Sequence, residues 1–213
     1  PPHPYGPPAP FDQEDAHDLY SGEVAYVDRE LGGFFSHLQQ TGRMDSTLVI
    51  LTADHGEALG EKGEDTHSYF AYNNTIHIPL IIHLPGQTDS HRVEDFVSHI
   101  DLFPKVCKLF DQTVPAHLQG RSLVPLLQGK KGGPSPLIYF ESLNAHLSWD
   151  WAPLRGMIED RVKFIDLPIK EVYDLTTDPA ELDNLARQGG IIGDPENPPP
   201  RMRRARSRPP PPA

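Results

Sequence analysis

The sequence has little cysteine, little positive charge and no long hydrophobic run. Cys107 is the single cysteine among 213 residues, so no disulfide can form within the chain. No apolar run approaches the roughly 20 residues that a membrane-spanning helix needs. The formal net charge of -11 argues against nucleic acid and against an anionic membrane as partners. The chain also lacks a P-loop, a G-x-S-x-G elbow and a C-x-x-C pair, the usual signatures of nucleotide, serine-hydrolase and dithiol chemistry.

Proline is abundant, with 24 residues, and much of it lies at the two ends of the chain. This composition predicts a proline-rich connector over residues 1–14 and a disordered tail of proline and arginine over residues 188–213. The first residue is proline and not methionine. We therefore expect the chain to be part of a longer protein.

The central region alternates between helical and strand patterns. From Asp15 to Gly42, apolar residues recur every three or four positions, which predicts an amphipathic helix. The continuous apolar run Thr47–Thr52 predicts a buried strand, and Ile78–Gly86 predicts another. A short helix is expected over Ser98–Phe110. This alternation predicts an α/β core over residues 15–135, with a mixed or parallel sheet and flanking helices.

The region that follows has the pattern of a small antiparallel sheet. One strand is expected over Pro136–Ser142, and two more over Leu154–Pro168, joined by a tight turn at Glu159-Asp160. The segment from Glu171 reads as a fourth strand, then a turn and a short helix. We therefore predict a small antiparallel subdomain over residues 136–187.

Two side chains that can bind a metal follow the first of these strands. Asp54 and His55 come directly after the apolar run, and Gly56 allows the chain to turn there. Ligands of open α/β sheets bind beyond the carboxyl ends of the strands. The pair can therefore supply two ligands of a divalent cation. Alternatively, Asp54 only caps the following loop. Two ligands are too few for a tight site, so others must come from elsewhere.

His67 is the second candidate, because it follows a loop that glycines interrupt. It can bind an anionic oxygen or protonate a leaving group, or it can be an ordinary surface histidine. Glu57 can support a metal ligand or simply be solvated. Other histidines (His77, His83, His99) have structural interpretations. Asp101 is expected to cap a helix, and Cys107 to be a small buried apolar residue.

Five blocks, in the same order and with similar spacing, resemble the C-terminal half of sulfatases, members of the alkaline phosphatase-like superfamily. They are "LVILTADHGEALGEKGE", "NNTIHIPLIIHLPG", "VSHIDLFPKVCKLF", "LQGRSLVPLLQGK" and "KFIDLPIKEVYDLTTDPAELDNLA". The resemblance covers about Tyr20 to Ala186. It implies an α/β fold and a divalent cation at the carboxyl ends of the central strands.

The resemblance also assigns roles to individual residues. Asp54 and His55 match a metal-binding pair, for which the family usually uses calcium. Many sulfatases carry Asp-Asn there, and the Asp-His version also occurs in phosphonate and phosphate ester hydrolases. An imidazole ligand brings manganese and zinc into consideration. His67 matches a position where the family places a basic residue on the sulfate or on the leaving-group oxygen.

The nucleophile of the family is a formylglycine, made from the cysteine or serine of a C/S-x-P-x-R stretch. This chain has no such stretch, and "KLF" after Cys107 does not match it. We therefore expect the C-terminal portion of a metal-dependent sulfuric ester hydrolase that acts on a sulfate ester and is inactive as a fragment. One alternative is a phosphodiesterase or phosphonate monoester hydrolase that acts on a phosphate ester. Another is a non-catalytic remnant that binds anionic ligands.

Overall fold

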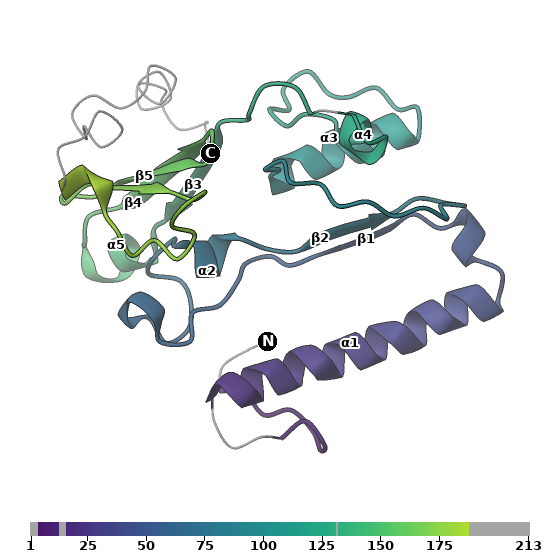
Figure 1. Cartoon of the computed structure of the whole chain (residues 1–213), viewed down its shortest axis with the longest axis horizontal. Coiled ribbons are helices and arrows are strands. Elements are labelled where there is room, and N and C mark those ends of the chain that lie inside the picture. The colour runs from purple at the N-terminus through teal and green to yellow at the C-terminus, as the bar shows by residue number, and fades with distance from the viewer. Residues whose placement is uncertain (1–3, 13–15, 131, 188–213) are drawn as a thin grey trace. The chain divides into compact units, whose positions relative to one another are not determined.

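The chain forms two compact units, Pro1–Ser90 and His91–Ala213 (Figure 1). The fold is described from a computed structural model, which describes residues 4–12, 16–130 and 132–187. The expected tail over residues 188–213 lies outside this range, as do parts of the expected connector. The predicted domain boundaries therefore stay a prediction. No helix in the described part is long and apolar enough to cross a membrane.

The first unit begins with a long helix, α1 (Ala16–Gln40), as the amphipathic pattern predicts. Gly42 follows it with a positive φ of 65°, a conformation that glycine adopts without strain. The apolar stripe of α1 remains largely open, because Val24, Val27 and Phe34 are about half exposed. Such a face is ordinarily buried against another layer of structure. A short 3-10 turn, η1 (Met44–Ser46), leads on to the first strand.

Strands β1 (Val49–Thr52) and β2 (Leu80–His83) form an antiparallel pair in which Thr52 faces Leu80. The expected parallel pairing is not confirmed, because every strand pair in the described residues is antiparallel. The expected burial of these strands was wrong as well, because no residue of β1 is fully buried and Ile81 of β2 is 60% exposed. A continuous apolar run does not fix strand direction. A parallel pair would also need a crossover to the far end of the first strand. The segment between β1 and β2 instead returns to the end at which it left.

The connecting segment between β1 and β2 holds two short helical turns. They are η2 (Glu61–Gly63) and α2 (Asn73–Ile76). Both ends of the segment are fixed by the pairing of β1 with β2. Asp54, His55 and His67 therefore all lie in one loop whose two ends are held by strand pairing.

The second unit opens with the expected helix, in two parts. They are η3 (His99–Asp101) and α3 (Leu102–Leu109), and α4 (Val124–Leu127) follows. Ser98 and Asp101 form a reciprocal capping box, which satisfies backbone N–H groups at the start of the helix. The Asp101 carboxylate also accepts a hydrogen bond from the backbone of Arg121, at 2.7 Å. Cys107 is buried, as expected.

A four-stranded antiparallel meander completes the second unit. Its strands pair in chain order, β3 (Ile138–Ser142), β4 (Leu154–Glu159), β5 (Val162–Asp166) and β6 (Glu171–Asp174). Asp160 and Arg161 both have positive φ, the mark of a tight turn that suits the twist of a hairpin. The core centres on Met157, Phe164 and Val172.

Two shorter elements flank the meander, α5 (Asn144–Trp149) and η4 (Leu185–Arg187). Trp149 ends α5, and its ring centroid lies 5.8 Å from that of Trp151. Both indole rings are about half exposed. A buried ion pair joins Lys163 of β5 to Glu181, with 2.6 Å between the charged atoms.

Candidate active site

Asp54 and His55 leave β1 with their polar atoms close together. Asp54 Oδ2 lies 3.6 Å from His55 Nε2. The backbone N–H of His55 donates to Asp54 Oδ1 at 3.0 Å, and His55 Nδ1 donates to the carbonyl of Gly56 at 2.7 Å. Because Nδ1 carries the proton, the Nε2 of a neutral His55 keeps its lone pair. The two side chains therefore present one anionic and one neutral donor atom at the strand exit.

The electrostatics of Asp54 favour its charged form. The backbone N–H of His55 and its own backbone N–H hold the pKa of Asp54 below its ordinary value, and nearby His55 acts in the same direction. A metal ligand has to be deprotonated to bind. Ligand atoms lie about 2.0–2.6 Å from a divalent cation, so two donors 3.6 Å apart can share one ion.

Gly56 is required where the chain turns after this pair. Its N–H donates to the carbonyl of Thr75 at 2.7 Å. A Cβ at this position would lie 2.1 Å from the backbone oxygen of Asn74, a distance that no real contact allows. The turn is therefore pressed against the backbone of α2, and only glycine fits.

A narrow backbone hairpin folds the next residues back on themselves. The N–H of Ala58 donates to Thr66 at 2.8 Å, and that of Gly60 donates to Glu64 at 3.0 Å. Gly60 and Gly63 have positive φ, which permits the tight reversal between them. The hairpin therefore brings Glu57 and His67 together, although ten residues separate them along the chain.

The carboxylate of Glu64 holds the residues that follow this hairpin in place. Glu64 is buried and accepts a hydrogen bond from the backbone N–H of Tyr69 at 2.8 Å and a longer one from that of Phe70 at 3.3 Å. Burial raises the pKa of Glu64, and the two N–H groups oppose that effect. The chain is thus anchored directly after His67.

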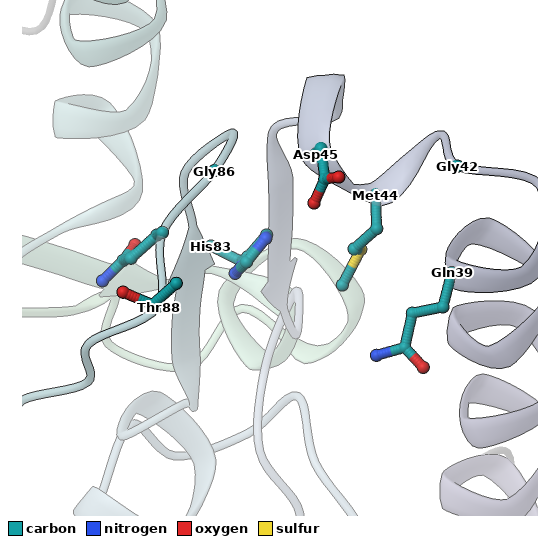
Figure 2. A pocket seen from close by; sticks show the side chains of 8 residues that line it. Gln39, Gly42, Met44, Asp45, His83, Gly86 and Thr88 are labelled. Atoms are coloured by element: carbon teal, nitrogen blue, oxygen red, sulfur yellow. The ribbon is translucent and has the colours of Figure 1, made fainter.

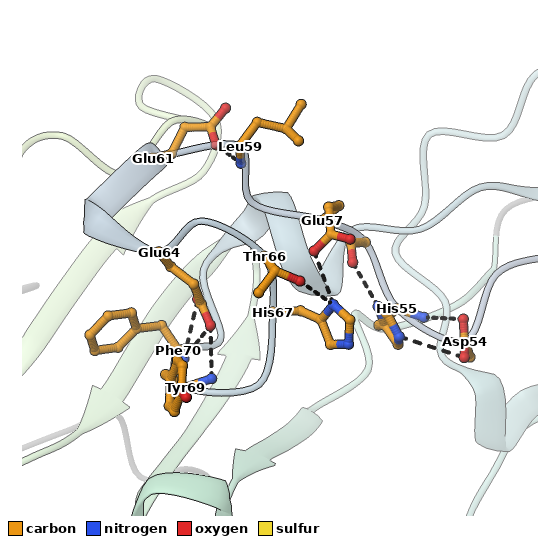
Figure 3. A network of polar contacts seen from close by, with 11 residues as sticks. Asp54, His55, Glu57, Leu59, Glu61, Glu64, Thr66, His67, Tyr69 and Phe70 are labelled. Carbon is orange, nitrogen blue, oxygen red and sulfur yellow. Dashed lines mark hydrogen bonds and ion pairs between the residues drawn. The ribbon is translucent and has the colours of Figure 1, made fainter. Parts of the chain in front are cut away.

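His67 lies against the metal-binding candidate His55. Their ring centroids are 3.9 Å apart, with 33° between the ring planes. The Nδ1 of His67 lies 3.0 Å from Glu57 Oε1 and 3.1 Å from Thr66 Oγ1 (Figure 3). The side chain of His67 is one-third exposed, whereas that of Glu57 is 3% exposed. His67 can therefore reach a bound molecule while Glu57 stays behind it.

Glu57 is surrounded by groups that stabilise its negative charge. Burial acts to raise its pKa, but hydrogen bonds from His67, Thr66 and Tyr5 outweigh burial and hold the pKa of Glu57 below its ordinary value. Tyr5 belongs to the proline-rich segment that precedes α1 and is itself buried. Burial and the neighbouring Glu57 raise the pKa of the Tyr5 hydroxyl.

The structure brings the three predicted site residues, Asp54, His55 and His67, into one cluster. Of the other candidates, His77 directly follows α2, His99 begins η3, and Cys107 belongs to α3. His83, at the end of β2, lines a hollow of about 290 Å³ with Asp45 and Gln39 (Figure 2). No group of three or more His, Cys, Asp or Glu side chains that could hold a metal ion occurs within the described residues.

The sequence analysis left the role of Glu57 open and missed those of Thr66 and Tyr5. The glycines at positions 60 and 63 did carry a usable signal, since a tight reversal between them places Glu57 opposite His67. Nothing in the local pattern linked Tyr5 to this loop. Its contact is made across a long stretch of chain.

Comparisons with known sequences place the chain in a family. The profile of the family described as Sulfatase matches residues 1–112, and that of N-sulphoglucosamine sulphohydrolase, C-terminal, matches residues 63–191. Arylsulfatase K of Xenopus laevis is 30% identical over 198 residues, which cover 84% of this chain and 36% of that protein. The multifunctional alkaline phosphatase superfamily protein PehA of Trinickia caryophylli is 31% identical over 186 residues, 78% of this chain and 35% of its own length.

Solved structures agree with the sequence comparisons. Phosphonate monoester hydrolase of Agrobacterium radiobacter matches with a TM-score of 0.69 and 27% identity, over 85% of this chain and 39% of that one. The phosphonate monoester hydrolase of Silicibacter pomeroyi matches with a TM-score of 0.73 and 26% identity, over 90% and 40%. The chain spans little more than a third of the length of the curated relatives named above. Because each of the two profiles covers more than half of its residues, the chain belongs to the sulfatase family, and it fits the C-terminal part of such proteins.

Proposed function

We propose that this chain is the C-terminal portion of a metal-dependent sulfuric ester hydrolase whose substrate is a sulfate ester. The observation that carries the proposal is the cluster of Asp54, His55 and His67 at the exit of β1. An ionised carboxylate and an imidazole lone pair lie within reach of one cation, and a second imidazole lies beside them. This combination suits the cleavage of a charged ester.

Asp54 and His55 would hold the cation, which we propose to be calcium, with manganese or zinc as alternatives. A carboxylate suits all three ions, whereas an imidazole favours manganese or zinc more than calcium. The remaining ligands would come from outside the described residues, because these offer no larger cluster of such side chains. When bound, the cation would supply Lewis-acid polarisation of the ester oxygens.

His67 would stabilise developing negative charge or protonate the departing alcohol. The proposed nucleophile is a formylglycine, which would belong to a part of the longer protein that this chain lacks. The chain alone would therefore bind a cation weakly and turn over no ester.

Calorimetric titration of the chain with Ca²⁺, Mn²⁺ and Zn²⁺ tests the metal site. With only two ligands from this chain, we expect a dissociation constant on the order of 1 mM. Asp54→Ala should remove the binding. Asp89→Ala, which removes an exposed carboxylate of the same unit, should leave it unchanged. Equal binding by wild type and Asp54→Ala would show that the assignment of Asp54 is wrong.

Turnover is tested in the longer protein that contains this chain. There Asp54→Ala should reduce metal-dependent cleavage of an aryl sulfate by at least about a thousandfold, since loss of a ligand misplaces the cation (~4 kcal/mol). Adding excess cation should not restore the rate fully. Normal turnover by this variant would reject the proposed site.

A second candidate is hydrolysis of a phosphate diester or a phosphonate monoester at the same site. His55 in the metal-binding pair favours this alternative, and two similar solved structures are named phosphonate monoester hydrolases. Both reactions use the same arrangement of groups. Measurement of kcat/KM for matched aryl sulfate and phosphate diester substrates separates them, because the natural chemistry should show the larger value.

A further inference from the structure

The strongest unassigned feature is the buried carboxylate behind His67. We propose that Glu57 is the positioning residue of His67: its carboxylate holds the Nδ1–H of the ring and so leaves Nε2 as the atom that meets the bound ester. This inference rests on the proposed function for what His67 does. The position and tautomer of the ring can be measured independently.

Glu57 and His67 are in direct contact. Glu57 Oε1 lies 3.0 Å from His67 Nδ1, within the ordinary range of an N–H···O hydrogen bond, and the Glu57 side chain is 3% exposed. A carboxylate that is ionised can only accept a hydrogen bond. Nδ1 must therefore be the protonated nitrogen of His67 whenever the ring is neutral.

The other ring nitrogen of His67, Nε2, is not engaged by Glu57. Nδ1 is occupied by Glu57 and Thr66, as the dashed lines in Figure 3 show. Nε2 lies on the opposite side of the imidazole ring, and one-third of the His67 side chain is exposed. An imidazole held at Nδ1 by a carboxylate is the general arrangement of catalytic triads. When such a ring is protonated, Nε2–H faces the ester, and transfer of that proton to the departing alcohol leaves the neutral Nδ1–H ring. Glu57 thus acts through His67 and does not need to touch the substrate.

Glu57 is itself held in place by its surroundings. The backbone pairing of Ala58 with Thr66 sets the spacing between the two arms of the hairpin. The Tyr5 hydroxyl helps to lower the pKa of Glu57, and the Tyr5 ring packs edge-on against Tyr20 with 5.4 Å between centroids. Residues before α1 and within it therefore support the carboxylate.

Direct metal binding by Glu57 is the competing role. The described residues hold no group of three metal-capable side chains, so Glu57 does not join Asp54 and His55 in one. The Glu57 carboxylate instead accepts a hydrogen bond from His67 at 3.0 Å. Its position behind the ring favours support of His67 over contact with an ion.

The tautomer of His67 provides the decisive measurement. We would label the histidines of the chain with ¹⁵N, record long-range ¹H–¹⁵N correlation spectra, and assign His67 by its loss in His67→Gln. The wild type should show the Nδ1–H tautomer at a pH where the ring is neutral. An Nε2–H tautomer in the wild type overturns the proposal without any variant.

Two substitutions then test whether Glu57 is the cause. Glu57→Met keeps a long side chain but offers no strong acceptor, so His67 should lose its preference for Nδ1–H. Glu57→Gln keeps an acceptor oxygen and should retain most of that preference. Asp65→Ala removes an exposed negative charge from the same loop and should change nothing. An unchanged tautomer in Glu57→Met would falsify the proposal.

Kinetics and metal titration separate this inference from the proposed function. In the longer protein, Glu57→Met should lower kcat at least tenfold for esters with poor leaving groups and much less for 4-nitrophenyl esters, with KM little changed. Glu57→Gln should recover most of the loss. If Glu57→Met instead abolishes Ca²⁺ binding and leaves the tautomer intact, Glu57 is a ligand and the positioning role is wrong. If the wild type hydrolyses no ester, the proposed function fails while the tautomer result stands.

Discussion

Two ion pairs, one in each unit, illustrate opposite uses of the same chemistry. In the loop between β1 and β2, Glu57 pairs with His67, and the histidine remains one-third exposed. In the four-stranded sheet, Lys163 pairs with Glu181, and neither side chain exceeds 1% exposure. Both pairs place a carboxylate in a dry environment. Only the first leaves the nitrogen-bearing partner, His67, accessible to another molecule.

The difference shows how exposure decides what a charged pair can do. In a fully buried pair, both charged groups have lost their contact with water. Such a pair contributes to the specificity of the fold and can take no further part in chemistry. A pair with one accessible member can still exchange a proton or bind an anion. The buried pair should therefore affect stability when it is broken, and the half-exposed pair should affect chemistry.

Breaking the buried pair of Lys163 and Glu181 should have the largest effect on the free energy of unfolding. Glu181→Ala removes the carboxylate partner of Lys163, whose amine is fully buried, so we expect a loss of about 3–5 kcal/mol in the free energy of unfolding. The double variant Lys163→Met, Glu181→Leu should recover most of this loss, because it removes both charges. Urea-induced unfolding measures both. A single-variant cost below about 1 kcal/mol would contradict the comparison.

Lys105 sharpens the comparison because it is a buried cation for which no hydrogen-bond partner occurs among the described residues. Burial lowers the pKa of Lys105 to about 8. Between that value and the ordinary pKa of about 10.4, the unfolded chain binds more protons than the folded chain. Stability should therefore rise as the pH increases from about 8 to about 10.5.

Lys105→Met should remove this pH dependence and raise stability at pH 7 by about 2 kcal/mol, because no charge then needs to be buried. Lys108→Met, on the exposed side of α3, is the matched control and should change neither quantity. Chemical unfolding at a series of pH values makes the test. A wild-type stability that stays flat over this range would show that the Lys105 amine is solvated.

Gly56→Ala should produce the smallest of these changes, and the quantity affected is the free energy of cation binding at the site. The new Cβ would meet the backbone oxygen of Asn74, so the turn that carries Asp54 and His55 must shift. We expect cation affinity to fall about tenfold, which corresponds to about 1.4 kcal/mol. Gly32→Ala, in α1 with open space around it, should leave affinity unchanged and stabilise the helix slightly. Calorimetric titration of both variants compares them directly.

Much of the fold could be predicted because it is local. The periodicity of α1, the capping residues near Asp101 and a tight turn between β4 and β5 each act over a few residues. The turn lies at Asp160-Arg161, one residue later than predicted, because Glu159 still pairs with Val162. The direction of β2 could not be predicted, since apolar strands look alike in either orientation. Pairing direction depends on where the connecting segment leads, and sequence pattern does not contain that path.

The candidate site divides in the same way. Asp54, His55 and His67 could be named because their types and positions after an apolar strand suggest chemistry, although their roles stay predictions. The partnership of Glu57 with His67 depends on the backbone hairpin, and that of Tyr5 with Glu57 depends on packing between distant segments. Such contacts follow from tertiary structure. They become visible only when the chain is folded.

The paired indoles of the second unit have a practical consequence. Trp149 and Trp151 are the two tryptophans of the whole chain, and both belong to the unit that contains the meander. Indole fluorescence is therefore a spectroscopic reporter of that unit, suited to following the substitutions at Lys163, Glu181 and Lys105. The loop with Asp54 and His67 contains no tryptophan of its own. A variant could lose the order of that loop while its emission spectrum stays that of the native protein.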